Sequence, residues 1–114
     1  MTIIICGSRY WTDYGKIARY IASLSKDCTI IEGAARGVDR IAGNAADAAG
    51  MDHITVHANW NRYGKAAVPI RNERMLDLDP DLVVAFHENI EKSKGTKHIL
   101  SRATAYEIET KIIS

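Results

Sequence analysis

Four segments of this 114-residue chain combine glycines, hydroxyls and basic side chains in the pattern that phosphate binding needs. They are Gly7-Ser8-Arg9, residues 33–39, residues 60–69 and Gly95-Thr96. Glycine turns let backbone N–H groups approach an anion, and guanidinium groups bind phosphate through paired hydrogen bonds. These residue types therefore predict a ligand that carries phosphate, such as a nucleotide or a phosphorylated sugar-like metabolite.

The second segment joins a predicted strand to a predicted helix. The β-branched run Thr29-Ile30-Ile31 is typical of a buried strand, and apolar residues recur at helical spacing from Val38. The turn between them is expected to leave unpaired N–H groups at a helix N-terminus, with Arg36 adding a mobile positive charge. The alternative is an ordinary strand-to-helix turn in which Asp39 caps the helix and Arg36 is solvated, because the spacing is not that of the GxGxxG fingerprint.

Apolar periodicity predicts strands that alternate with helices along the whole chain. We expect strands near residues 3–6, 29–31, 53–57, 82–86 and 108–113, and helices near residues 13–25, 38–50, 69–76 and 95–106. Residues 58–68 show no period and are expected to form a long loop with a functional role. The alternation implies a single domain over residues 1–114, an α/β Rossmann-like doubly wound parallel sheet of about five strands with helices on both faces.

Ligands of doubly wound sheets bind in the crevice beyond the carboxyl ends of the strands, where all four segments are expected to meet. Three aromatic residues nearby, Trp11, Trp60 and Tyr63, could stack on a base. The predicted ligand-binding residues are Gly7, Ser8, Arg9, Trp11, Gly33, Ala34, Arg36, Gly37, Asp39, Trp60, Tyr63, Lys65, Arg71, Asn72, Gly95 and Thr96.

Several of these residues also have structural interpretations. Trp60 is expected in the core or at an interface, with base stacking as the alternative. Asp39 either accepts a ribose hydroxyl or only complements the helix dipole. Arg71 could cap its helix and pair with Glu73 or Asp77, and Gly95-Thr96 could be a simple turn and N-cap.

The composition limits the possible partners. A net charge of +1 gives no global footprint for nucleic acid or for an anionic membrane, and no apolar run reaches the length of a membrane span. Cys6 and Cys28 are expected to be packed, reduced thiols, and the cytoplasm is the expected location. His53 and His57 lack a third ligand, so we expect no metal, and we expect no cofactor. Ser8 has no evident His–Asp partners for a hydrolase triad.

Six motifs in order along nearly the whole chain resemble the YspA-type branch of the SLOG superfamily. They are Gly7-Ser8-Arg9 with Trp11, the run GAARGVD at 33–39, the run WNRYGKAA at 60–67, Pro69-Ile70-Arg71-Asn72 with Met75, the run PDLVVAF at 80–86, and Gly95-Thr96. This superfamily groups Rossmann-like domains related to the LOG phosphoribohydrolases and to the single-strand DNA-binding protein DprA. The resemblance implies a nucleotide-derived ligand in the crevice, and a bacterial or phage protein.

The chain departs from the LOG enzymes where their catalytic groups lie. Their phosphate loop has the form PGGxGTxxE, whereas here only Gly95-Thr96 is kept and Ile99 stands at the position of the glutamate. Arg71 matches the LOG catalytic arginine, but Asn72 follows it in place of a lysine. Cleavage of an N-glycosidic bond needs a carboxylate, which Asp39 or Glu32 could supply only if the fold brings it to the crevice.

Three functions follow as expectations. The first is a module that senses or sequesters a nucleotide-derived molecule, such as an ADP-ribose-like or cyclic nucleotide signal. The second is a hydrolase of nucleotides or nucleosides, which the missing glutamate disfavours. The third is a DprA-like single-strand binder, which the near-neutral charge disfavours. The amphipathic helices and exposed aromatics, together with the resemblance, also predict a homodimer or homotetramer.

Overall fold

Five parallel strands form one sheet in the computed structural model, which describes residues 1–114. The strands are β1 (Thr2–Gly7), β2 (Thr29–Glu32), β3 (Asp52–Thr55), β4 (Leu82–Phe86) and β5 (Glu109–Ile113). Their order in the sheet is β3-β2-β1-β4-β5, and every neighbouring pair is parallel. The prediction of a doubly wound parallel α/β sheet is confirmed.

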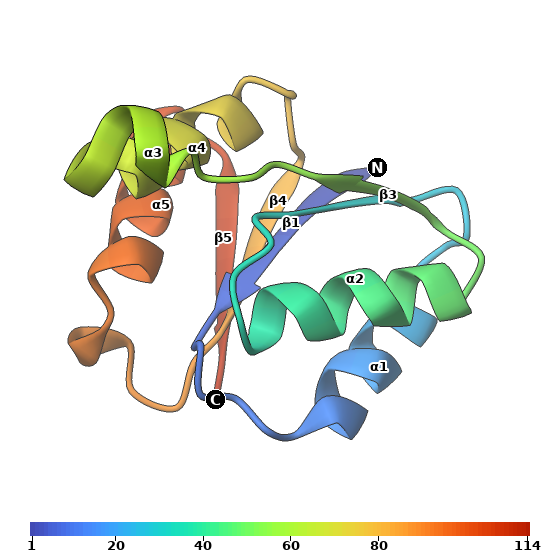
Figure 1. Ribbon diagram of the computed structural model, residues 1–114. Coiled ribbons are helices and arrows are strands. Elements are labelled where there is room, and N and C mark those ends of the chain that lie inside the picture. Colours follow the sequence, from blue (N-terminus) through green and yellow to red (C-terminus); the bar gives the residue numbers. More distant parts are fainter.

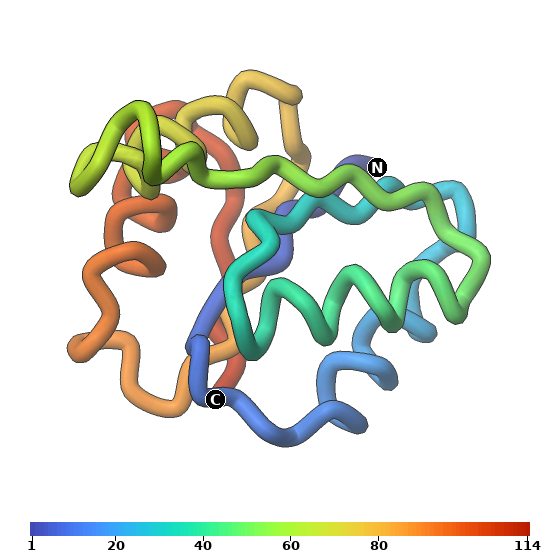
Figure 2. Tube along the Cα trace, in the orientation of Figure 1, coloured from blue at the N-terminus to red at the C-terminus, as the bar shows by residue number.

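Helices cover both faces of the sheet. On one side lie α1 (Tyr14–Ala22) and α2 (Val38–Ala48), and on the other lie α3 (Trp60–Tyr63), α4 (Ala67–Leu76) and α5 (Lys94–Ala105) (Figure 1). Two short 3-10 turns, η1 (Gly64–Ala66) and η2 (Ile90–Lys92), precede α4 and α5. The segment after β3 crosses to the opposite side of the molecule to reach α3 (Figure 2). No helix is both long and apolar enough to cross a membrane.

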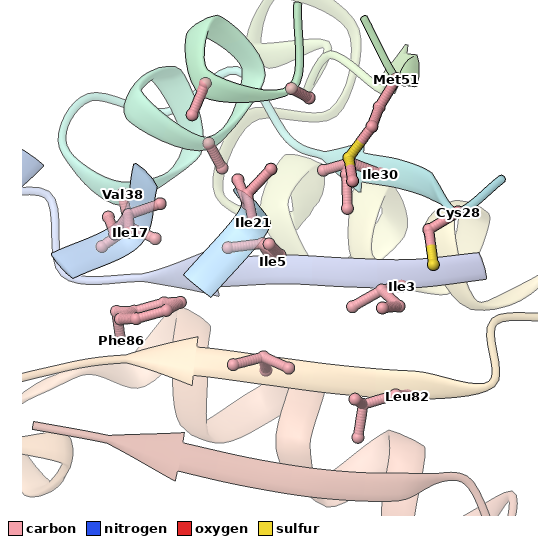
Figure 3. Close-up of a cluster of buried hydrophobic side chains, with 14 of the residues drawn as sticks. Ile3, Ile5, Ile17, Ile21, Cys28, Ile30, Val38, Met51, Leu82 and Phe86 are labelled. Carbon is pink, nitrogen blue, oxygen red and sulfur yellow. The ribbon is translucent and has the colours of Figure 1, made fainter. Parts of the chain in front are cut away.

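Alternation along the central strands divides the core in two. Ile3 and Ile5 point toward α1 and α2, where they pack in the cluster drawn in Figure 3, while Ile4 points toward α4 and α5. Helices cover both faces of β1 and β4, so Ile3–Cys6 of β1 and all of β4 are buried and apolar. Cys6 and Cys28 are buried free thiols, as predicted.

The predicted helices are present, and local capping explains where two of them begin. The Asp13 carboxylate accepts a hydrogen bond from the N–H of Lys16 (3.0 Å) at the start of α1. The Ser93 hydroxyl accepts one from the N–H of Thr96 (3.1 Å) at the start of α5, so Ser93 and not Thr96 is the N-cap.

The loop expected over residues 58–68 is largely helical. Asn59 caps α3 by accepting a hydrogen bond from the N–H of Arg62 (3.1 Å), and η1 leads directly into α4 with Pro69 in its first turn. The sequence showed no helical period there because neither α3 nor η1 buries a residue, so no apolar face is needed.

The strand order creates one point where the segments that follow two neighbouring strands leave toward opposite faces of the sheet. After β1 the chain passes to α1 on one face, and after the adjacent β4 it passes to α5 on the other. The carboxyl ends of these two strands therefore border an open crevice, the usual ligand site of such sheets.

Candidate functional site

A cleft of about 800 Å³ occupies the crevice between β1 and β4. The chain after β1, the chain after β4, the helix α4 and the first turns of α5 form its walls. This volume is within the range of small-molecule sites in proteins.

The cleft is more positive than the chain as a whole. Its lining contains five basic residues and two acidic ones, whereas the whole chain has a net charge of +1. Four of the basic residues are exposed around its opening, and we call them the rim cations: Arg9, Lys65, Lys92 and Lys94. The fifth, Arg71, is buried. A concave surface lined by one sign of charge concentrates ligands of the opposite sign.

Arg71 is held at the floor of the cleft by two hydrogen bonds. Its Nη1 donates to the carbonyl oxygen of Gly33 (2.6 Å) and its Nε donates to Oδ1 of Asn72 (3.0 Å). The ion pair with Glu73 or Asp77, considered above as the structural alternative, is absent, because Glu73 pairs with Arg102 and Arg71 points inward. Gly33 permits this contact, since a methyl group there would overlap the guanidinium.

Asn72 ties α4 to the start of α5. It is 2% exposed, and its Nδ2 donates to the carbonyl oxygen of Gly95 (3.3 Å) and lies 3.1 Å from Nδ1 of His98. Because Oδ1 of the same amide binds Arg71, Asn72 fixes the guanidinium relative to the N-terminus of α5.

Asp39 also lies at the floor, and it is 4% exposed. Its Oδ2 accepts hydrogen bonds from the N–H groups of Gly33 (3.1 Å) and Ala35 (3.3 Å). Burial raises the pKa of Asp39 to about 7, although the nearby Arg71 and the two amides act in the opposite direction. The fold thus brings to the cleft one of the two carboxylates considered above.

The expectation of free amides in the turn after β2 is wrong for Gly33, Ala34 and Ala35. The N–H of Ala34 donates to Oε1 of Glu32 (2.6 Å), while Asp39 accepts from the other two. Two carboxylates of the chain therefore occupy the place expected for an external anion.

Glu32 lines a second, smaller cavity of about 310 Å³ on the other side of this turn. Its Oε2 accepts from Nε2 of His53 (2.7 Å) and from the hydroxyl of Thr55 (2.5 Å), and Nδ1 of His53 lies 3.1 Å from Asp47. Burial of the ring lowers the pKa of His53, but the hydrogen bonds to both carboxylates outweigh this effect and raise it. Glu32 thus joins the turn to the edge strand β3.

The structure brings ten of the sixteen predicted site residues to the cleft: Gly7, Ser8, Arg9, Asp39, Trp60, Lys65, Arg71, Asn72, Gly95 and Thr96. Six lie outside its lining: Trp11, Gly33, Ala34, Arg36, Gly37 and Tyr63. Gly33 still supports the floor through Arg71. Gly37 packs against the backbone of Ser8 and Arg9 at a φ of +75°, which a side chain would disturb.

The aromatic predictions need correction. Trp11 cannot stack on a ligand, because its ring packs edge-on against Phe86 in the core and its Nε1 donates to the carbonyl oxygen of Asp13 (2.9 Å). Tyr63 lies between Arg62 and Arg74 outside the cleft. Trp60 is not in the core but 59% exposed, at the cleft lining. Arg36 is exposed outside the cleft.

Several residues of the segment that follows β4 line the cleft and were not predicted from the sequence. The hydroxyl of Ser8 donates to Oε1 of Glu88 (2.5 Å), which lines the cleft with His87, Lys92 and Lys94. The available signal was position, since Glu88 comes two residues after a strand whose carboxyl end faces the crevice.

A family model described as the YspA, cpYpsA-related SLOG family matches residues 1–63, which is more than half of the chain. The chain belongs to this family. The matched part of this SLOG chain includes β1, β2, the turn after β2 and the helix α2, which contains Asp39.

Two further comparisons agree with this assignment. The SLOG chain is 29% identical over 110 residues to the Gene 61 protein of Mycobacterium phage D29, an alignment that covers 89% of this chain and 86% of that protein. Its structure resembles that of DNA processing protein A (DprA) from Streptococcus pneumoniae, with a TM-score of 0.82 and 19% identity over 99% of this chain. The chain spans half the length of that DprA chain. This likeness shows the shared fold.

Proposed function

We propose that the cleft binds a nucleotide-derived ligand and that the protein senses or sequesters it. The observation that carries this proposal is the concentration of positive charge at the switch point of the sheet. Five basic side chains converge there on a cleft large enough for a nucleotide. Family membership supports the proposal, because the SLOG resemblance implies such a ligand.

The phosphate would lie at the start of α5. The first amides of this 12-residue helix, those of Lys94 and Gly95, have no acceptor within the protein, and the helix dipole adds positive potential. Lys92 and Lys94 flank the same turn, and Arg9 and Lys65 complete the rim. Backbone N–H groups at a helix N-terminus and basic side chains are the groups that commonly bind phosphate in proteins.

One observation favours hydrolysis as a second candidate. Asp39 is a carboxylate at the floor of the cleft whose pKa of about 7 would suit a general acid or base. Against it, Ile99 fills the position of the LOG glutamate and is packed in the core at 1% exposure. Binding without turnover therefore remains our first proposal, hydrolysis is the second, and a DprA-like single-strand binder is the third.

A thermal-shift screen tests the proposal. The purified protein is mixed with AMP, ADP, ADP-ribose, NAD and cyclic dinucleotides, and each mixture is then separated by chromatography. A ligand at about 100 times its Kd stabilises by roughly 2.7 kcal/mol, a shift of about 10 °C for a chain of this size. Recovery of the intact ligand supports binding, and recovery of a free base supports hydrolysis.

Charge-removal variants locate the effect. The double variant Lys92→Gln/Lys94→Gln should lose most of the shift, whereas Lys26→Gln, which removes an exposed charge outside the cleft, should keep it. No shift with any of these compounds, or an equal shift in both variants, would contradict the proposed site.

A further inference from the structure

The floor of the cleft places a buried carboxylate beside a buried guanidinium without pairing them. Gly33 anchors both side chains, since its N–H donates to Oδ2 of Asp39 and its carbonyl accepts from Nη1 of Arg71. The other two polar ends, Oδ1 of Asp39 and Nη2 of Arg71, have no partner in the protein and are not sealed from the cleft. The two groups do not form an ion pair with each other, so these two polar ends remain available to a ligand in the cleft.

The charges of the floor and the rim suit different parts of a ligand. Asp39 and Arg71 are neutral as a pair when both are ionised, whereas the rim cations and the start of α5 are positive. The electrostatic attraction on a phosphate is strongest at the rim, whereas at the floor the carboxylate of Asp39 would repel it. A neutral group that can donate to Oδ1 and accept from Nη2 fits the floor, as two adjacent hydroxyls of a sugar do.

We infer that Asp39 and Arg71 recognise the sugar hydroxyls of the nucleotide, with Asp39 accepting a hydrogen bond as a carboxylate while the phosphates lie at the rim. This inference rests on the proposed function and adds the orientation of the ligand and the basis of its specificity. It predicts that the floor distinguishes ribonucleotides from deoxy analogues, and it favours the ribose-acceptor interpretation of Asp39 over the purely electrostatic one.

The protonation of Asp39 gives the inference a measurable signature. The titratable and charged groups around it are Cys6 on β1, Glu32 on β2 and Arg71 on α4, and the two histidines of the cleft are His87 and His98. The ionised carboxylate accepts from a hydroxyl through Oδ1, whereas a proton on Oδ1 turns that atom into a donor, because Oδ2 already accepts from the two amides. Because burial holds the pKa of Asp39 near 7 in the free protein, ligand binding should release a proton and strengthen as the pH rises.

The first test compares ADP with 2′,3′-dideoxy-ADP by isothermal titration calorimetry at pH 6 and pH 8. The two probes have the same phosphates, so the ratio of their Kd values measures the contribution of the sugar hydroxyls alone. ADP should bind about tenfold more tightly than the dideoxy analogue at pH 8, because a hydrogen bond to a charged acceptor is lost. The preference should shrink severalfold at pH 6, where only about one tenth of a group with a pKa near 7 is ionised.

The variant Asp39→Asn provides the second test. Its amide oxygen can still accept from Gly33 and Ala35, while an NH₂ group replaces the acceptor that faces the cleft. ADP binding should weaken about tenfold to hundredfold, and the preference over dideoxy-ADP should disappear. The control Asp47→Asn makes the same change on α2 outside the cleft, so it should keep both the affinity for ADP and the preference for ADP over dideoxy-ADP.

The outcomes separate the inference from the proposed function. If both probes bind equally well and Asp39→Asn binds like the wild type, the inference is overturned and the proposed function stands. If ADP binding weakens with rising pH and survives in Asp39→Asn, the floor meets an anionic group, and the inference is equally overturned. If the wild type binds neither ADP nor any nucleotide of the screen, the proposed function fails and the inference fails with it.

Discussion

Gly33→Ala should displace the Arg71 guanidinium and destabilise the protein. A methyl group on Gly33 would lie 2.6 Å from Cζ and 2.9 Å from Nε of Arg71, so the whole guanidinium would have to move. The move breaks the bond of Nη1 to the Gly33 carbonyl (2.6 Å) and the bond of Nε to Asn72 (3.0 Å). Together these charge-assisted bonds are worth about 2–4 kcal/mol.

The backbone offsets only a small part of this loss. Replacing glycine by alanine lowers the entropy of the unfolded chain and returns about 0.4–1 kcal/mol. At roughly 4 °C per kcal/mol for a chain of this length, the Tm should fall by about 5–15 °C. Differential scanning calorimetry measures the change, and ADP binding should weaken in the same variant.

Gly95→Ala is the matched control for this experiment. A methyl group on Gly95 would meet only Cγ1 of Val68, at an ordinary contact distance of 3.5 Å, and alanine favours a helix. This control should keep or raise the Tm. An unchanged or higher Tm in Gly33→Ala would refute the role assigned to Gly33 as the support of Arg71.

Two predictions concern pH. The pKa of Asp39 is raised from 3.8 to about 7, so its stabilising contribution is full below pH 3.8 and is lost as the pH rises to 7. In urea unfolding, the free energy of unfolding of Asp39→Asn should therefore increase by about 4 kcal/mol relative to the wild type between pH 4 and pH 8. A difference between the two proteins that does not change with pH would contradict this. The pKa of His53 is raised, so its stabilising contribution is full below about pH 6.5 and is lost as the pH rises through that raised value. The Tm deficit of His53→Gln should therefore shrink with rising pH, and a deficit that does not change with pH would contradict this.

The strands and main helices could be predicted because their apolar patterns reflect burial directly. Ile3 to Cys6 and Leu82 to Phe86 are apolar throughout because helices cover both faces of the sheet. The same pattern failed over α3 and η1, which bury nothing. The carboxyl ends of the strands also identified the crevice, since the geometry of a parallel sheet brings them to one edge.

The details of the site could not be predicted, because they depend on contacts between distant segments. Nothing in the local sequence shows that Asp39 turns back onto the amides of Gly33 and Ala35. Trp11 follows a glycine turn, like a residue that contacts ligand, yet its position beside Phe86 makes it core. In the sequence Lys92 and Lys94 resemble solvated surface charges, but the end of η2 and the start of α5 place them beside the cleft.

The central claim is that the cleft between β1 and β4 is the ligand site, and an NMR titration of the ¹⁵N-labelled protein with ADP tests it most directly. We predict that the amide signals of Ser8, Arg9, Gly95 and Thr96 shift during the titration, because these residues line the cleft. Shifts confined to Arg40, Asn44 and His57, which line the second cavity, would contradict the claim, as would a spectrum unchanged at millimolar ADP.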